Sequence, residues 1–172
     1  LMMNFNNISA LGENYNDPLA TVVDLSLAGN NGTTNGPTWN STGKYGGAFE
    51  FDATNDYVEV LHSDSLAFSS ELTYVVWFKT LGGGGLISKN DANAGNMHVK
   101  NLLLGVDTIM FISHNDATYQ YTSDSLSFVD NNWHFTAVTV KDNDHVNMYL
   151  DGEMVFNESI SVDILESENK PL

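Results

Sequence analysis

Two carboxylates stand two residues apart at Glu50 and Asp52, a spacing that could support acid–base chemistry. In an extended strand such residues lie on one face about 7 Å apart and could share a proton. A structural interpretation competes with this one: Phe49 and Phe51 fill the core, while Glu50 faces solvent and Asp52 begins a turn. We expect the structural interpretation, because a retaining glycosidase needs two carboxylates placed across the scissile bond and one such strand does not supply them.

The other reactive residue types show no catalytic spacing. The five histidines, at positions 62, 98, 114, 134 and 145, fit neither a metal site nor a triad. His134, beside Trp133, is expected to be a satisfied residue of a sheet. The four glycines at 82–85 are expected to connect two strands, because no Lys-Ser/Thr pair at a helix start follows them, as a phosphate loop requires. We therefore predict no catalytic residue and no enzyme activity.

Four Asn-x-Ser/Thr triplets, the acceptor motif for N-glycosylation, favour an exported protein. They place candidate glycosylation sites at Asn7, Asn31, Asn40 and Asn157. We predict that the chain is extracellular or on a cell surface and that at least one of these asparagines carries a glycan.

The charge of the chain excludes several partners. It has 22 acidic residues against 6 basic ones, a net charge of −16, and all the basic residues are lysine. So negative a field repels phosphate, which excludes nucleic acid and anionic membrane surfaces as main partners. The chain has no cysteine, which excludes disulfides and thiolate sites. No apolar run approaches the roughly 20 residues that span a bilayer, so we predict no membrane insertion.

Length and patterning predict one all-β domain. A chain of 172 residues with 42% hydrophobic content suits a single domain over residues 1–172. Short alternating runs separated by Gly, Asn and Asp predict an antiparallel two-sheet jelly-roll sandwich, and Asp151-Gly152 is a two-residue hairpin signal. The expected strands are 1–6, 48–52, 57–61, 72–80, 86–89, 97–104, 108–114, 118–122, 133–141, 145–151 and 153–157. We expect one core with contributions from Phe49, Phe51, Val76 or Trp77, Ala137 and Tyr149.

Several segments together resemble the laminin G-like branch of the concanavalin A-like lectin and glucanase superfamily. They cover nearly the whole chain in the family's order: residues 24–33, 43–52, 56–60, 72–79, 86–89, 133–138 and 148–152. The resemblance implies the jelly-roll fold. It does not fix a function, because the superfamily includes lectins, adhesion modules and glucanases.

The resemblance also implies a structural calcium ion. Asp24 and Asn30 occupy positions of a loop that looks like an ion site in related jelly rolls, and Ca²⁺ prefers carboxylate and amide oxygens. Asn31 is ambiguous, because a glycan there would preclude ligation. The alternative is that Asp24 caps a turn.

Two departures from the family pattern bear on function. Some glucanases of the superfamily carry a third carboxylate where this chain has Asn55. The family's closing strand after the Asp-Gly hairpin is also missing here, which leads us to expect an exposed sheet edge or a strand supplied from elsewhere. A neighbouring copy's segment, such as Leu1–Phe5, is one candidate for that strand.

The sequence therefore favours a non-catalytic, extracellular structural or adhesive module. Strand exchange between copies would make it a self-assembling filament subunit or homo-oligomer. The alternative is a carbohydrate-binding, lectin-like module, and the expected ligands are a glycan or a surface protein.

Overall fold

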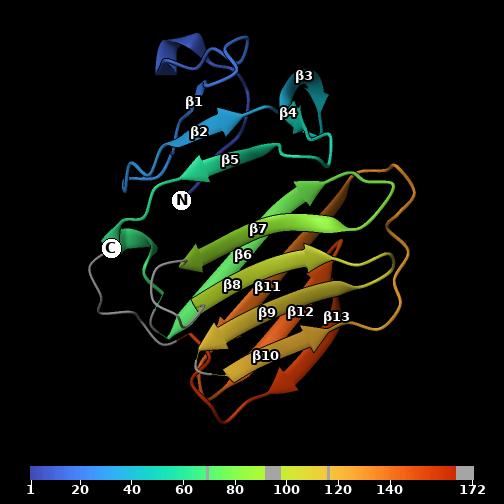
Figure 1. Ribbon diagram of the computed structural model, residues 1–172. Helices are drawn as coiled ribbons and strands as arrows, with labels where there is room; N and C mark the ends of the chain where they lie inside the picture. Colours follow the sequence, from blue (N-terminus) through green and yellow to red (C-terminus); the bar gives the residue numbers. More distant parts are fainter. Residues whose placement is uncertain (69, 92–97, 116, 166–172) are drawn as a thin grey trace. The chain divides into compact units, whose positions relative to one another are not determined.

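The computed structural model describes residues 1–68, 70–91, 98–115 and 117–165. Every strand pair within them is antiparallel, which confirms the predicted all-β class (Figure 1). The chain divides into two compact units, Leu1–Ala67 and Phe68–Leu172, each of which is described separately. The prediction that residues 1–172 fold as a single domain stays a prediction.

The first unit is built from short strands and two single-turn 3₁₀ helices. A three-stranded sheet has the order β1-β2-β5, and β3 and β4 form a separate hairpin. The elements are η1 (Ser9–Leu11), β1 (Thr21–Val22), β2 (Gly32–Asn35), β3 (Thr38–Gly43), β4 (Gly46–Glu50), β5 (Tyr57–Val60) and η2 (Asp64–Leu66).

Aromatic packing holds this unit together. Tyr15 and Val22 are buried, and the Tyr15 ring lies 4.8 Å from that of Phe49. Trp39 donates a hydrogen bond from Nε1 to the carbonyl of Phe5 (2.8 Å), which holds the start of the chain in its own unit. Residues 1–6 are not a strand, contrary to our expectation, because Phe5 has a φ of 53° and the Met2 N–H donates to Asp24 rather than to a strand.

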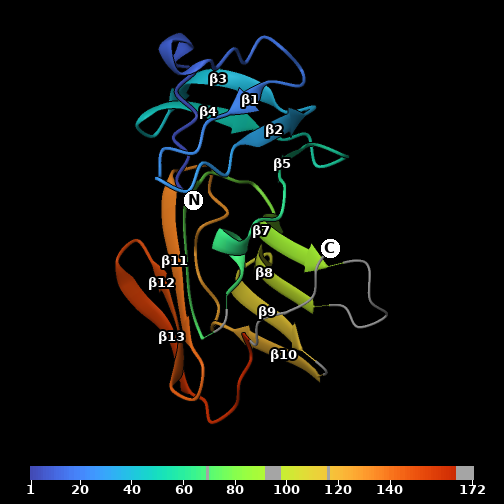
Figure 2. The same ribbon diagram turned by 90° about the vertical axis from the view of Figure 1, so that its left-hand side faces the viewer.

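The second unit is a sandwich of two four-stranded sheets, seen nearly edge-on in Figure 2. Their orders are β10-β9-β8-β7 and β13-β12-β11-β6. The strands are β6 (Glu71–Phe78), β7 (Gly84–Asp91), β8 (His98–Leu104), β9 (Ile109–Asn115), β10 (Ala117–Thr122), β11 (His134–Lys141), β12 (His145–Leu150) and β13 (Glu153–Ser159).

Side chains from both sheets fill the interior of the sandwich. Leu102 and Phe111 from one sheet, and Val138 and Met148 from the other, are fully buried. Burial alternates residue by residue along β6 and β12, as a strand with one face inward requires. Each of these four side chains contributes about 1.5–3 kcal/mol by leaving water.

The expectation of a single core is wrong, because the buried residues form two clusters, one in each unit. Phe49 packs in the first cluster, and Phe51 is 52% exposed. Of the two alternatives Val76 and Trp77, Val76 packs against the second cluster, as predicted. Trp77 and Ala137 lie on the outer face of their sheet, whereas Phe78 and Val138 point inward. Alternation alone does not say which face of a strand points inward when both are apolar.

The remaining predicted strands all overlap observed ones. The predicted two-residue hairpin is also confirmed: Asp151 and Gly152 have φ values of 52° and 92°, as a type I′ turn between β12 and β13 requires. The sequence missed β1, which has only two residues, and β2 and β3, which contain Gly and Asn residues typical of turns.

Candidate functional site

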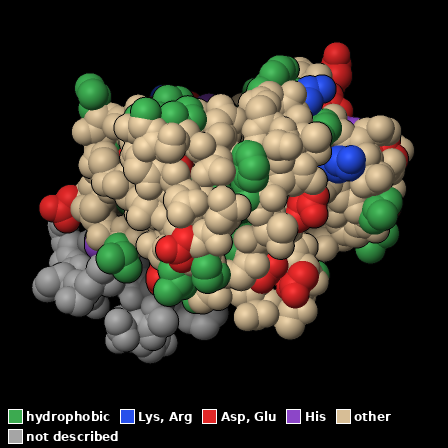
Figure 3. Space-filling model, turned by 90° about the horizontal axis from the view of Figure 1, so that it is seen from above, with side chains coloured by type: hydrophobic (Ala, Val, Ile, Leu, Met, Phe, Trp, Pro, Cys, Tyr) green, Lys and Arg blue, Asp and Glu red, His purple; other side chains and the backbone are tan. Residues whose placement is uncertain are grey.

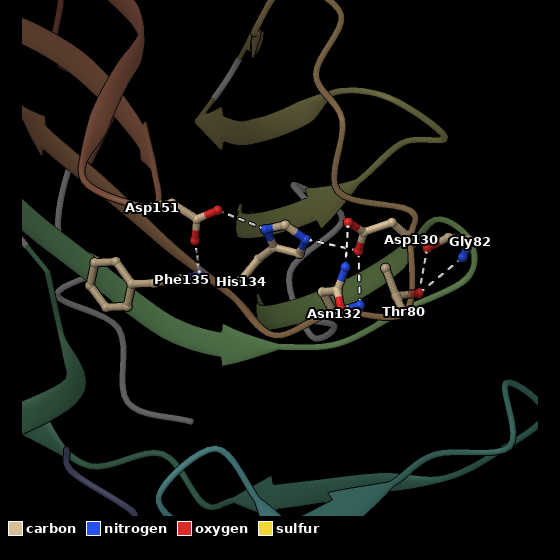
Figure 4. A network of polar contacts seen from close by, with 7 residues as sticks. All are labelled: Thr80, Gly82, Asp130, Asn132, His134, Phe135 and Asp151. Carbon is tan, nitrogen blue, oxygen red and sulfur yellow. Dashed lines mark hydrogen bonds and ion pairs between the residues drawn. The ribbon is translucent and has the colours of Figure 1, made fainter.

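His134 is the centre of a polar network in the described part of the second unit (Figure 4). It begins β11 on the inward face, and its side chain is 10% exposed. Nδ1 lies 2.7 Å from Asp151 Oδ2, and Nε2 lies 3.1 Å from Asp130 Oδ1. The ring also packs 5.8 Å from the ring of Phe78.

Local turns hold both carboxylates in place. Asp151 begins the turn between β12 and β13, and its Oδ1 accepts the N–H of Phe135 (2.8 Å). Asp130 accepts hydrogen bonds from the backbone and side-chain amides of Asn132, both at 2.8 Å. The neighbouring Asn131 N–H donates to the carbonyl of Thr80, which ties this loop to the end of β6.

The network favours a protonated histidine. Burial of the ring opposes a positive charge, but the hydrogen bonds to Asp151 and Asp130 outweigh it and raise the pKa of His134. Hydrogen bonds from Asn132 and His134 lower the pKa of Asp130 to about 2. Because ionised carboxylates only accept, both ring nitrogens act as donors and neither is left to take a proton from a substrate. The network is therefore suited to joining loops and not to general-base catalysis.

The carboxylate pair at Glu50 and Asp52 does not form a catalytic arrangement. Glu50 is exposed and accepts a hydrogen bond from Asn40 Nδ2 (2.6 Å). Asp52 lies beyond the end of β4, and its Oδ1 accepts the Thr54 N–H (2.8 Å) in a turn. The structural interpretation is confirmed for these two residues.

Asp24 organises the loop between β1 and β2. Its carboxylate accepts hydrogen bonds from the backbone of Met2 (2.9 Å) and Asn30 (2.8 Å), and from both the backbone and the hydroxyl of Ser26 (2.9 and 2.8 Å). Desolvation alone would raise its pKa, but these hydrogen bonds lower the pKa well below its usual range. Asp24 thus acts as a turn cap that joins residue 2 to residue 30.

Asn30 lies next to Asp24, so the structure brings the two predicted calcium ligands together. The Asn30 amide, however, is bonded to Ser63 and Ser65 at 2.5 and 2.9 Å. A calcium ion at this loop would have to replace some of these hydrogen bonds. Among the described residues, no group of three His, Asp or Glu side chains could hold a metal ion. Calcium binding stays a prediction.

The four sequon asparagines lie in different surroundings. Asn31 and Asn157 are exposed, and Asn7 and Asn40 are half-buried. Asn7 and Asn31 use Oδ1 to accept the N–H of Tyr15 and Asp24, both at 2.9 Å. Asn157 donates from Nδ2 to Asn147 across the β12–β13 pair. Their glycosylation stays a prediction.

The sheet β13-β12-β11-β6 has one of its edges at β13. That a missing closing strand leaves this edge open stays a prediction. Within the described residues β13 has a strand neighbour, β12, on one side only, and β10 likewise ends the facing sheet. Both strands lie low in Figure 1. A shallow hollow between them is lined by Thr122, Asp124, Met154, Val155, Phe156 and Asn157.

Comparison with protein families agrees with this fold. Residues 52–172 match the model described as the concanavalin A-like lectin/glucanases superfamily, a laminin G type. The chain belongs to this superfamily. The resemblance of the sequence is thereby confirmed, and the description covers both lectins and glucanases, so membership alone does not choose between binding and catalysis.

Solved structures extend the fold comparison. The binding domain of Paraclostridial Mosquitocidal Protein 1 matches 85% of this chain at 17% identity with a TM-score of 0.66, and the chain spans 40% of that structure. The carbohydrate binding module CBM66 from Bacillus subtilis matches 77% of this chain and 81% of its own length, at 20% identity and a TM-score of 0.46. A comparison with curated proteins gives no match. No helix in the described part of the chain is long and apolar enough to cross a membrane.

Sequence reasoning missed the partners of His134 and the surroundings of the edge. A signal was available for the first: Asp130 precedes His134 by four residues in a turn-forming stretch, and Asp151 opens a recognisable hairpin. No pattern in the sequence indicates that Tyr121 meets Phe156 beside the hollow, with ring centroids 6.2 Å apart.

Proposed function

We propose that this chain is a non-catalytic, extracellular structural or adhesive module that accepts an extended protein segment along β13. The observation that carries this proposal is the exposed edge of β13 beside a hollow with apolar residues. An edge strand presents backbone N–H and C=O groups to which another strand can be added, and side chains at alternate positions then enter the hollow.

The polar groups support a binding role over catalysis. Both nitrogens of His134 face carboxylates, Asp52 caps a turn, and Asp24 is occupied by four hydrogen bonds. On the face drawn in Figure 3, carboxylates are scattered among polar and apolar side chains. A net charge of −16 further disfavours phosphate-bearing partners.

The added strand can come from a second copy, which would build a filament or oligomer, or from another protein. Leu1–Phe5 is a poor donor, because Met2 and Phe5 are hydrogen-bonded within their own unit. Sedimentation velocity over a concentration series at low and high salt tests self-assembly. A monomer at every concentration and salt removes the filament form of the proposal.

Hydrogen exchange tests the strand-accepting role itself. A partner bound along the edge slows exchange of the β13 amides, whereas a partner bound elsewhere leaves them unchanged. As a matched pair, Val155→Lys lies on this edge, and Val75→Lys lies on the outer face of β6, in the other edge strand of the same sheet. Only Val155→Lys is expected to abolish binding; equal loss from both variants contradicts the proposal.

A lectin-like role is the second candidate, and the outer face of the β13-β12-β11-β6 sheet favours it. The rings of Trp77 and Phe135 lie 5.3 Å apart on this face. Tyr149 lies two strands from Val75 along the next row. Aromatic rings beside polar side chains suit the apolar faces and hydroxyls of sugars. A glycan array with the wild type and Phe135→Ala tests this role, and signals unchanged by the substitution would rule out this face.

Calcium and glycosylation complete the proposal. Titration calorimetry with Ca²⁺ against the wild type and Asp24→Asn tests the Asp24–Asn30 loop, and heat from the wild type alone would support an ion there. The intact mass of the protein from its native source tests Asn7, Asn31, Asn40 and Asn157. A mass equal to that of the polypeptide alone would show that no glycan is attached, and glycosylation would then no longer support an extracellular location.

A further inference from the structure

The hollow beside β13 is open along one side of the sandwich, where the edges of both sheets meet it. Residues 154–157 of β13 line one wall, and Thr122 at the end of β10 and Asp124 line the other. A segment lying here would pass between the edges of two sheets. The backbone of such a segment would lie next to the edge of β13, where it could form hydrogen bonds with that strand.

Apolar side chains form part of the lining of the hollow. Val155 and Phe156 are half-buried and pack against the core cluster of the second unit. Met154 is 54% exposed, so it offers apolar surface that an added segment would cover. Every second side chain of an extended segment points to one side, and apolar side chains at these positions would pack beside Val155 and Phe156.

The rim of the hollow is negative. Asp124 is among its lining residues, and the exposed Glu153 and Glu158 lie at either end of β13. The lining residues include no lysine. Tyr121, whose ring contacts Phe156, lies close enough to be affected by this charge. Its pKa is raised, first by burial and then by the negative charge of Glu158.

We infer that the partner segment is basic: a Lys- or Arg-bearing, alternately apolar extended segment of another protein that adds to β13 as a fifth strand. This inference rests on the proposed strand-accepting function and names its partner. Phe156 pairs with the inward-facing Met148, whereas Met154 pairs with Tyr149 on the outer face. Apolar side chains on the inward-facing side of the segment therefore cover Phe156. The segment's long Lys or Arg side chains lie within the negative field of Asp124, Glu153 and Glu158, which gives charge complementarity.

The same features disfavour a second copy as the occupant. Two copies would approach with a net charge of −16 each. The β12–β13 register also shifts between Met148 and Tyr149, and the resulting bulge leaves Val155 without a cross-strand partner. Bulges and charges on edge strands hinder pairing between identical edges. The negative charge of this chain attracts a basic segment and repels an identical copy.

Synthetic peptides test this inference on the whole, unglycosylated chain. The probes are nine-residue peptides that alternate Val with Lys or Val with Glu, and hydrogen exchange by mass spectrometry reads protection of residues 154–159. The Val-Lys peptide is expected to protect these amides and the Val-Glu peptide to leave them unprotected. Two N-methylated forms of the Val-Lys peptide, blocked at the Val or at the Lys amides, distinguish strand addition from simple charge attraction. Only one form is expected to keep binding, because alternate amides point to opposite edges.

Charge variants locate the attraction. Glu153→Gln with Glu158→Gln is expected to weaken Val-Lys binding about three- to tenfold at low salt. The matched control, Glu50→Gln with Glu59→Gln, makes the same change in net charge at exposed positions of the first unit and is expected to leave binding within about twofold.

The outcomes separate this inference from the proposed function. Equal protection by both peptides, or equal weakening by both variant pairs, overturns the basic partner and leaves the strand-accepting role in place. Self-association with protection of β13 in the absence of peptide overturns it in favour of a second copy. If β13 is protected neither by peptides nor by self-association, both the inference and the strand-accepting function are wrong.

Discussion

Replacing His134 by alanine is expected to destabilise the second unit more at pH 5.5 than at pH 9. His134 is 10% exposed and joins two loops through Asp130 and Asp151. Because Asp151 is 48% exposed, its bond to the ring contributes at most about 1 kcal/mol. Loss of ring packing against Phe78 adds about 1 kcal/mol. Without counting Asp130, the expected loss at pH 5.5 is about 2 kcal/mol.

The direction of the pH dependence follows from the shifted pKa values. The pKa of His134 is raised above its ordinary 6.5, so its contribution is fully present below pH 6.5 and is lost as the pH rises through the folded-state pKa. The pKa of Asp130 is lowered from 3.8 to about 2, so its contribution is present above pH 3.8 and is lost as the pH falls through about 2. Between pH 4 and 6.5 both contributions are complete.

Urea unfolding followed by tryptophan fluorescence measures the effect, because Trp133 adjoins the substituted residue. The control is His145→Ala, whose side chain is 29% exposed and lies 3.4 Å from Asp144. It is expected to change the free energy of unfolding by less than about 0.5 kcal/mol. A loss for His134→Ala that is the same at pH 5.5 and 9, or that is larger at pH 9, would refute a protonated histidine between two carboxylates.

Three further predictions concern the first unit and the edge. Asp24→Ala removes the acceptor of three backbone amides and is expected to destabilise the first unit by at least about 2 kcal/mol in urea unfolding. The difference should narrow as the pH falls below 3.8, because the pKa of Asp24 is lowered in the folded state; a difference independent of pH would contradict this. Gly32→Ala places a Cβ 2.8 Å from Val58 Cγ1 and is expected to lower the melting temperature, whereas Gly85→Ala meets nothing closer than 3.8 Å and serves as its control. A glycan at Asn157, which is exposed on β13, is expected to block binding of the Val-Lys peptide; full binding by chain glycosylated there would place the peptide elsewhere.

The sandwich of the second unit could be predicted from the sequence because its signals are local. Alternation along β6 and β12 depends on neighbouring residues, and the Asp151-Gly152 turn needs positive φ at two adjacent positions. The first unit was harder to predict. Its strands β2 and β3 contain Gly and Asn, whose local preference is for turns, and pairing with β5 and β4 overrides that preference.

By itself the sequence determined the all-β class, most strand positions and the superfamily, because each depends on residue types at short and regular spacing. It also determined the charge that limits the partners. Only the tertiary structure decided which face of β11 is buried, since both faces are apolar and the choice depends on the sheet opposite. The tertiary structure also decided the hydrogen-bond partners of His134 and Asp24. Asp151 lies 17 residues from His134 in the sequence, and Met2 lies 22 residues from Asp24, so local patterns do not reveal either contact. The edge at β13 was decided in the same way: whether a strand is central or at an edge depends on its neighbours in the sheet and not on its own residues.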